Sequence, residues 1–376
     1  MKVLHISNDF AGSKVHSNLV KNLDLVGTKQ IVYCPVRDRR LIGNNQFFSI
    51  GTEFIYSYII KSWYKFFYHF KRKILYKDLK CKVNLEDIDL IHAATLFSDG
   101  GLAYKAYKEY NIPYLVAVRN TDINAFAKLQ PHVWQSGRKI LLNAKAIFFI
   151  SKALQCEFES LSFVKPIINQ IRAKFILQVN GIEREWLENV KRTPNLGKDV
   201  LYIGDFSSNK NVIRLMEAVK LLRSDGQYKD VNLTIIGGGK DKKGRTLKAV
   251  KGNHEFVSYL GRIYDKIVIQ EIMRQHALFV MPSIHETFGL VYIEALSQNL
   301  PVVYTKGQGI DKLFNEGESP VGIGVNPLSV EEIKNAIKKI MDNNIYTNKQ
   351  VDFSLFSWSN IAYKYKEIYS QIINIK

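Results

Sequence analysis

The chain has 376 residues, 46% of them hydrophobic and 23% charged, and this composition argues against a wholly disordered protein. At roughly 150 residues per domain, the length predicts two domains. Lys and Arg number 53 against 35 Asp and Glu, so the net charge of +18 indicates an anionic partner: a nucleic acid, a lipid headgroup surface or a phosphorylated small molecule.

The first half of the chain alternates short apolar runs with longer amphipathic stretches. Buried strands are predicted at residues 2–7, 29–34, 89–94, 114–119 and 146–151, with helices between several of them, such as 16–26 and 101–110. Because the sequence turns polar six residues after the N-terminus, we expect the first run to be a strand and not a signal peptide.

The same alternation returns in the second half. Strands are predicted at 199–204, 231–237, 277–283 and 301–305, a helix at 212–224 and an amphipathic terminal helix at 356–373. Apolar strands alternating with helices are typical of parallel sheets covered on both faces, so the chain predicts two doubly wound α/β domains. The polar stretch 185–198 marks their join, and ligands are expected in a cleft between them, beyond the carboxyl ends of the strands.

The basic residues gather in the first half. Residues 1–192 carry a net charge of +13 and residues 193–376 a net charge of +5; segment 54–82 alone has eight basic residues, one acidic residue and ten aromatic residues. Trp63, Phe66, Phe67 and Phe70 fall near helical spacing, which suits an interfacial helix on an anionic membrane. The alternative is a helix packed on its own domain. A nucleic-acid partner is not expected, since no RRM, KH, zinc or helix-turn-helix signature accompanies the charge.

Three widely spaced cysteines, Cys34, Cys81 and Cys156, support neither a disulfide framework nor a zinc site. No apolar window approaches 18 residues, so no membrane span is expected. These observations predict a cytoplasmic protein that can lie on the inner face of the membrane.

The stretch 281–303 carries the most specific motif. A predicted strand ends near Met281, a turn contains Glu286, and a helix follows that contains Glu294. Free backbone N–H groups at a helix start suit a diphosphate, and Gly289 lets a ligand approach the main chain closely. At helical spacing the two carboxylates would lie on nearly the same side and ~12 Å apart along the axis, which suits a sugar and a ribose and is too far for a metal clamp.

This stretch resembles the retaining glycosyltransferases of the GT-B fold, family 4, which use nucleotide-activated sugars. The resemblance implies an acceptor-binding Rossmann-like domain at 1–190, a nucleotide-sugar-binding domain at 191–355 and a terminal helix at 356–376 that packs back on the first domain. It also implies that Glu286 contacts the donor sugar, that Glu294 binds the ribose, and that the backbone of Phe288, Gly289 and Leu290 meets the diphosphate.

Further matches cover most of the chain: residues 179–182, 202–204, 235–239 and 356–358. In the family, the loop after the strand at 199–204 holds the donor phosphates and is called the phosphate loop here. It departs from the family pattern, because Asp205 follows Gly204 where an arginine is usual. Lys210 remains and would stabilise the departing diphosphate. Arg214 or Arg262 could replace the missing arginine. The glycine pair near the N-terminus is reduced to Gly12 and a serine.

The acceptor side is expected to involve Asn120, Thr121 and Asp122, which follow the strand at 114–119, together with His16. Asp122 could act as a general base, and the alternative is an Asx turn or helix cap. His16 could instead be a packed side chain. The Asp87–Asp89 pair mimics a metal-binding DxD motif but is interpreted as a turn before a strand.

We therefore predict a retaining hexosyltransferase that moves a sugar from a nucleotide diphosphate sugar to the hydroxyl group of a saccharide or lipid-linked saccharide, in bacterial cell-surface polysaccharide or lipopolysaccharide assembly. No cofactor or metal is expected beyond this co-substrate. The alternatives are a non-catalytic nucleotide-sugar-binding scaffold of the same fold, and an epimerase or phosphorylase on a similar fold.

Overall fold

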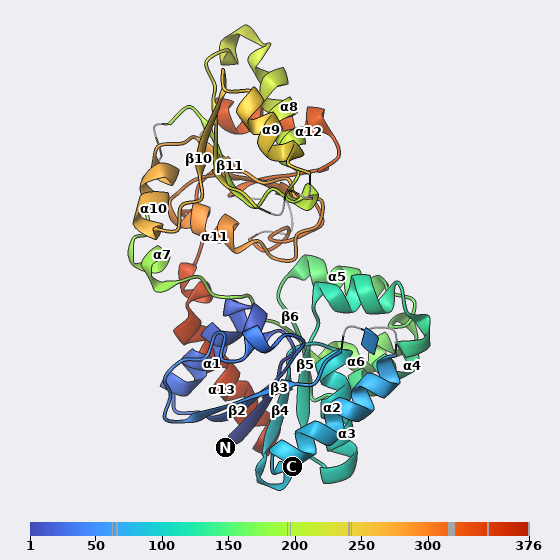
Figure 1. The fold of residues 1–376 in the computed structure, drawn as a ribbon. Coiled ribbons are helices and arrows are strands. Elements are labelled where there is room, and N and C mark those ends of the chain that lie inside the picture. Colours follow the sequence, from blue (N-terminus) through green and yellow to red (C-terminus); the bar gives the residue numbers. More distant parts are fainter. Residues whose placement is uncertain are drawn as a thin grey trace. The chain divides into compact units, whose positions relative to one another are not determined.

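A computed structural model of the chain describes residues 1–61, 63–64, 67–193, 195, 197–239, 241, 243–314, 320–343 and 346–374. The chain folds into two compact units (Figure 1). The N-terminal unit comprises Met1–Ile150, Leu154–Gly181 and Leu355–Lys376, and the C-terminal unit comprises Ser151–Ala153 and Ile182–Ser354. Each unit contains one parallel sheet with helices on both faces, as the alternating pattern predicts.

The N-terminal unit is built on a seven-stranded sheet in the order β3-β2-β1-β4-β5-β6-β7, in which every strand pair is parallel. The strands are β1 (Lys2–Ile6), β2 (Lys29–Val36), β3 (Thr52–Tyr58), β4 (Leu90–Ala93), β5 (Tyr114–Ala117), β6 (Ala146–Phe149) and β7 (Phe175–Leu177). The five predicted strands are all present. The two that were not predicted, β3 and β7, lie at the edges of the sheet, where most residues of the strand are only partly buried and the apolar signal is weak.

Helices cover both faces of this sheet (Figure 1). On one face, α1 (Lys14–Leu25) and α13 (Trp358–Asn374) share a core with apolar residues of β1, β4, β5 and β6. On the other face lie α2 (Tyr68–Lys82), α3 (Ser98–Tyr110) and α4 (Trp134–Asn143), followed along the chain by α5 (Lys152–Ser160) and α6 (Ile168–Ile171). The terminal helix therefore packs on the unit that contains the N-terminus, as the resemblance implies.

The basic aromatic segment 54–82 is not a single helix, and the sequence prediction is wrong here. Its first residues belong to β3, where they pair with β2, and the α-helix begins only at Tyr68. Trp63 and Phe67 precede this helix, and Phe66 lies outside the described residues. Of the described aromatic residues with helical spacing, Trp63 and Phe67 thus precede the helix and only Phe70 lies within it.

The C-terminal unit is built on a six-stranded parallel sheet in the order β10-β9-β8-β11-β12-β13. The strands are β8 (Val200–Gly204), β9 (Leu233–Gly237), β10 (Val257–Gly261), β11 (Leu278–Val280), β12 (Val302–Thr305) and β13 (Gly322–Val325). Helices α8 (Val212–Arg223), α9 (Arg245–Gly252) and α12 (Val330–Asp342) lie on one side, and α7 (Arg184–Glu188), α10 (Lys266–Arg274) and α11 (Leu290–Ser297) on the other (Figure 1).

Each sheet reverses its strand order once, between β1 and β4 in the N-terminal unit and between β8 and β11 in the C-terminal unit. In open α/β sheets, ligands bind at the carboxyl ends of the strands on either side of such a switch point, because the connecting helices leave on opposite faces there. In each unit, a ligand is therefore expected at the carboxyl ends of the two strands that flank the switch point; this side of the sheet is called its carboxyl edge.

Candidate functional site

The loop after β8 places Lys210 at the switch point of the C-terminal unit. This loop ends at Asn211, which adopts a left-handed backbone conformation (φ 60°) directly before α8. The Asn211 side-chain amide donates to the carbonyl oxygens of Pro282 at 2.9 Å and Pro327 at 2.6 Å. Lys210 is thus held against the loop that follows the neighbouring strand β11.

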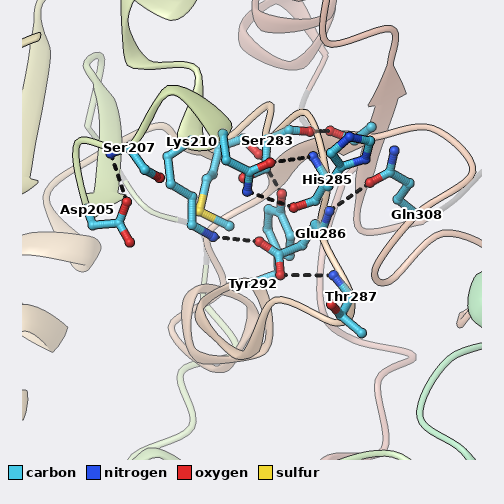
Figure 2. Close-up of polar contacts among 12 residues, drawn as sticks. Asp205, Ser207, Lys210, Ser283, His285, Glu286, Thr287, Tyr292 and Gln308 are labelled. Carbon is cyan, nitrogen blue, oxygen red and sulfur yellow. Dashed lines mark hydrogen bonds and ion pairs between the residues drawn. The ribbon is translucent and has the colours of Figure 1, made fainter. Parts of the chain in front are cut away.

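That second loop carries Glu286 and is held by two side-chain amides. Asn209 accepts from the His285 backbone N–H and donates to the His285 carbonyl oxygen, both at 2.9 Å. Gln308 accepts from the Glu286 N–H at 2.7 Å and donates to the Ile284 carbonyl at 3.0 Å. The backbone around Glu286 is therefore fixed from both sides (Figure 2).

Lys210 and Glu286 form an ion pair at the centre of this arrangement. Lys210 Nζ lies 2.7 Å from Glu286 Oε2, and Glu286 Oε1 accepts from the Thr287 N–H at 3.2 Å (Figure 2). The two side chains are 21% and 13% exposed, so solvent reaches both. The two residues expected to hold the leaving phosphates and the sugar of a donor thus lie side by side, although 76 positions separate them in the sequence.

The start of α11 completes this edge of the sheet. Gly289 precedes the helix with φ 79°, and a Cβ atom there would lie 2.5 Å from the ring of Tyr292, so only glycine fits. Tyr292 is anchored by its hydroxyl, which donates to the Met281 carbonyl at 2.5 Å. Phe288 is buried, and the backbone N–H groups of Leu290 and Val291 lie too early in the helix to donate to a carbonyl four residues before them within it, whereas the Tyr292 N–H donates to the Gly289 oxygen at 2.9 Å.

Glu294 lies within α11, whereas Glu286 lies in the turn before it, so the helical spacing expected between the two carboxylates does not apply. Burial raises the pKa of Glu294 to about 7; the nearby Glu183 carboxylate raises it further and the Lys266 ammonium opposes the shift. Lys266 in turn forms ion pairs with Glu183 and with Glu185, the latter at 3.0 Å.

Asp205 is placed as a turn residue. Its Oδ1 accepts from the Ser207 N–H at 2.9 Å (Figure 2), and its carbonyl oxygen accepts from the Tyr202 hydroxyl at 2.8 Å. Gly204, just before it, packs so closely on the next strand that a Cβ atom on Gly237 would lie 1.7 Å from the Gly204 oxygen. The sequence did not indicate this local role for the carboxylate.

Arg262 contacts the glycine turn, residues 237–239 at the end of β9, whereas Arg214 does not. The Arg262 Nη2 donates to the Gly238 oxygen at 3.1 Å. The same turn bonds to both neighbours of Asp205, because the Gly238 N–H donates to Gly204 at 3.3 Å and the Phe206 N–H donates to Gly239 at 3.1 Å. Arg214 instead donates to Asn211 Oδ1 at 2.9 Å. Arg214 thus contacts the end of the loop after β8, whereas Arg262 contacts the turn that is bonded to the residues on either side of Asp205.

In the N-terminal unit, Asp122 is buried and its two oxygens accept from three backbone N–H groups: Leu96 at 3.0 Å, Phe97 at 3.1 Å and Arg119 at 2.9 Å. Burial raises the pKa of Asp122 to about 6, and these bonds oppose the rise. The geometry favours the alternative interpretation, in which the Asp122 carboxylate caps backbone N–H groups.

The remaining acceptor-side candidates lie nearby along the chain. Asn120 accepts from the side chain of Asn124, and Thr121 precedes a π-helical stretch, Asp122–Ala127. His16 is on α1, and burial, with Arg119 and His5 nearby, lowers the pKa of His16 to about 3, so it is neutral. A Cβ atom on Gly12 would lie 2.9 Å from Asp9 Oδ1.

Sequence reasoning missed Asn209 and Gln308. Asn209 adjoins Lys210 in the chain, so its position in the phosphate loop was a usable signal. Gln308 had none, because its role depends on the distance between two loops. In the described part of the chain, no three His, Cys, Asp or Glu side chains are grouped to hold a metal ion. None of the described helices has both the length and the apolar character needed to span a bilayer.

The known proteins that resemble this chain in sequence include glycosyltransferases. Residues 184–354 match the model of the family "Glycosyl transferases group 1". An uncharacterized glycosyltransferase of Methanocaldococcus jannaschii is 25% identical over 79% of this chain and 79% of its own length. The GDP-mannose:cellobiosyl-diphosphopolyprenol alpha-mannosyltransferase of Komagataeibacter xylinus is 23% identical over 59% of this chain and 56% of its own length.

Solved structures share the fold. The sucrose-phosphate synthase of Thermosynechococcus elongatus superposes over 100% of both chains with a TM-score of 0.68 at 17% sequence identity. The predicted two-domain α/β GT-B fold and the predicted family resemblance are both confirmed.

Proposed function

We propose that this chain, whose residues 184–354 belong to the glycosyl transferases group 1, transfers a hexose from a nucleotide diphosphate sugar to a hydroxyl acceptor with retention of configuration. The observation that carries the proposal is the 2.7 Å pair of Lys210 and Glu286 at the switch point of the C-terminal sheet, beside the start of α11. A cation, a carboxylate and free helix N–H groups at one edge suit a donor that combines diphosphate and sugar hydroxyls.

Each group has a role that follows from its chemistry. When the bond between the sugar and the diphosphate breaks, negative charge develops on the leaving phosphate, and the Lys210 ammonium stabilises it. Glu286 accepts hydrogen bonds from sugar hydroxyls, and the backbone from Phe288 to Leu290 binds the diphosphate. Glu294, when ionised, accepts from the ribose hydroxyls. In this proposal no cofactor or metal is required.

Asp205 bears directly on this proposal. An anion in the phosphate loop repels a diphosphate, and Arg262, on the adjoining glycine turn, supplies a compensating cation. The Asp205 carboxylate also accepts a hydrogen bond from the Ser207 N–H, which reduces its electrostatic repulsion of a diphosphate. We assign Arg262 the part that an arginine at position 205 would otherwise have.

Asp122 acts in this proposal as a positioning residue, since three backbone N–H groups already use its oxygens. Gly12, His16, Asn120 and Thr121 stay candidates for contacts with the acceptor.

The acceptor is proposed to be a saccharide, free or lipid-linked, of bacterial cell-surface polysaccharide assembly. The mannosyltransferase relative named above acts on a diphosphopolyprenol-linked sugar by its name. In this chain Trp63, Phe67 and Phe70 are 45%, 56% and 48% exposed, and Trp63 stacks on Phe70 with centroids 5.6 Å apart. Such a cluster, with exposed lysines around it, suits the interface of an anionic membrane on the cytoplasmic side, a compartment in which three free cysteines persist.

A second candidate function is a non-catalytic nucleotide-sugar-binding scaffold, which Asp205 favours. A thermal-shift panel of UDP, GDP, ADP and their sugars, with and without magnesium, tests both. A ligand at a hundred times its Kd stabilises the folded state by about 2.7 kcal/mol. A shift with one diphosphate sugar, followed by its turnover, supports the transferase. A shift without hydrolysis or transfer supports the scaffold, and the absence of any shift contradicts both.

A further inference from the structure

The carboxyl edge of the N-terminal sheet has a switch point of its own, between β1 and β4. Ser7, Asn8 and Asp9 follow β1, and Ala94 and Thr95 follow β4; the Ala94 N–H donates to the Ile6 oxygen at 3.0 Å, which holds the two loops together. The same reasoning that locates a ligand at β8 and β11 locates one here.

Two polar atoms at this edge are buried without a hydrogen-bond partner among the described residues: the hydroxyl oxygen of Ser7, a residue only 3% exposed, and Oδ1 of Asn8. Leaving a buried polar atom unpaired is unfavourable, so such atoms usually mark a place where a ligand or water binds. Ser7 offers a donor and Asn8 an acceptor.

The Arg119 guanidinium lies at the same edge, where burial lowers its pKa and the nearby carboxylates of Asp122, Asp9 and Asp99 oppose the shift. Arg119 follows β5 and is half-buried; its Nε donates to the Ala94 oxygen at 3.2 Å. Within the described ranges, no carboxylate lies at ion-pair distance from Arg119, and no acceptor is assigned to its two terminal nitrogens. Placing a cation in a partly buried site without a partner is costly, and an anion would repay that cost.

Further cations surround the loop after β1. Arg37 follows β2. Burial raises the pKa of Asp9, and the Arg119 and Arg37 guanidinium groups oppose this rise, so both lie near this loop. Lys71, on α2, is half-buried close to Arg37 and Asp99, and burial lowers the pKa of Lys71.

Of the three carboxylates near Arg119, Asp99 and Asp122 are already engaged in hydrogen bonds, and the pKa of the third, Asp9, is raised by burial. Asp99 accepts from the Asn8 N–H at 3.3 Å and from the Thr95 hydroxyl at 3.0 Å, and burial raises its pKa to about 7, so it carries only part of a charge at neutral pH. Asp122 is taken by three backbone N–H groups. The Arg119 guanidinium, in contrast, keeps most of its donors available to a ligand.

We propose that this edge of the N-terminal unit binds an anionic group of the acceptor, a phosphate or a carboxylate, with Arg119 as its partner. The Ser7 hydroxyl donates to the same group, and Asn8 Oδ1 accepts from an acceptor hydroxyl. This inference rests on the proposed function, since it names the acceptor class, but its binding step occurs on a different unit from the donor site.

The test uses the full chain and two probes, inorganic phosphate and acetate, titrated at constant ionic strength while the melting temperature is recorded. Phosphate is expected to stabilise the wild type and Lys108→Gln, a charge-matched control on an exposed position of α3. Arg119→Gln is expected to weaken phosphate binding at least tenfold and Ser7→Ala a few-fold. A response to acetate as well would assign the site to carboxylates and phosphates alike.

Arg119→Lys guards against misfolding, because it keeps the charge and should bind phosphate within a few-fold of the wild type. The nucleotide panel, run on the same variants, reports the donor site separately: Arg119→Gln should keep the full nucleotide shift. If Arg119→Gln and Ser7→Ala both bind phosphate and acetate as the wild type does, or if neither probe binds the wild type, the inference is overturned. A missing nucleotide shift would instead contradict the proposed function.

Discussion

Lys210 Nζ and Glu286 Oε2 lie 2.7 Å apart and join the loop after β8 to the loop after β11. The pair neutralises two partly exposed charges at the point where the strand order reverses. A diphosphate sugar exchanges this contact for two others: the ammonium turns to phosphate and the carboxylate to sugar hydroxyls. Because both replacements are charge-assisted hydrogen bonds, donor binding need not leave either charge unpaired.

Glu286→Ala is expected to abolish sugar transfer, and Lys210→Ala to lower kcat about 10²- to 10³-fold, the usual effect of removing one group that stabilises transition-state charge. Steady-state kinetics with the donor identified in the nucleotide panel provides the measurement. Lys220→Ala, an exposed lysine of α8, is the matched control and should keep wild-type kcat. Wild-type turnover by Glu286→Ala would refute the assigned role.

Arg262→Ala is expected to weaken donor binding about tenfold, or about 1.4 kcal/mol, since it removes the cation tied to the glycine turn beside the phosphate loop. Asp205→Asn should act in the opposite direction and tighten binding, because it removes an anion and keeps an oxygen for the Ser207 N–H. Isothermal titration with the nucleoside diphosphate measures both. Asp265→Asn, which alters a carboxylate that caps α10, controls for general charge effects and should leave the affinity unchanged. Equal affinities for Arg262→Ala and the wild type would remove Arg262 from the site.

Because the pKa of Glu294 is raised, the unfolding free energy is expected to depend on pH. This pKa is raised to about 7 in the folded state, so between about pH 4.5 and 7 the folded protein holds a proton that the unfolded chain has lost. The contribution of Glu294 to the unfolding free energy therefore falls as pH rises through this window. Glu294→Gln does not titrate, so above pH 7 it should be more stable than the wild type by about 1–3 kcal/mol, with no gain near pH 4.5.

Denaturant unfolding at a series of pH values measures this difference, with Glu188→Gln as an exposed control. The same variant should bind the nucleoside diphosphate more weakly, and wild-type affinity should decline below pH 7 as the carboxylate gains its proton. A stability difference that is independent of pH would show that the folded pKa of Glu294 is not raised.

Asp122→Asn separates a capping role from a catalytic one. The amide keeps one oxygen for three N–H donors, so the unfolding free energy should fall by about 1–3 kcal/mol, while kcat measured well below the melting temperature changes less than threefold. A general base in this position would instead account for 10²- to 10⁴-fold of the rate. Such a loss of kcat in a variant shown by circular dichroism to be folded would restore Asp122 to the chemistry.

The exposed aromatic cluster predicts membrane association. A variant with Trp63, Phe67 and Phe70 all changed to Ala should lose flotation with vesicles that contain anionic lipid, since it loses the apolar groups that enter the interface. Tyr363→Ala, an exposed aromatic of α13 at 61%, is the control and should float as the wild type does. If the wild type itself fails to float at low salt, the membrane proposal falls.

The sequence predicted the centre of each sheet better than its edges. Val3 and Leu4 of β1, and Leu278 and Phe279 of β11, are completely buried, so these strands read as continuous apolar runs. At the edges, Val257 is the one buried residue of β10 and Ser57 the one buried residue of β3. An edge strand with so few buried side chains does not read as a continuous apolar run.

The site shows the same division. Glu286, Lys210 and Gly289 could be found because each belongs to a local motif, and their proximity follows from the order of parallel strands. The contacts of Gln308 and Arg262 could not, because each depends on how closely two loops approach, which no local pattern specifies. Asp205 illustrates the point: its residue type suggested a repelled phosphate, and only the fold gave its carboxylate a backbone N–H to accept from.

Helix α13 has a consequence for how the protein is made. Tyr369 lies 2.6 Å from His92, and Lys366 donates to the Val26 oxygen, so α13, which follows the C-terminal unit along the chain, closes a core begun by β1 and α1. On the ribosome, the N-terminal unit waits with the apolar sides of Leu19 and Leu23 uncovered while the whole C-terminal unit emerges and can fold. The core of the N-terminal unit is therefore completed only after α13 has been synthesised, and a chain truncated before Trp358 would join a C-terminal unit to an N-terminal unit whose core is uncovered on one face.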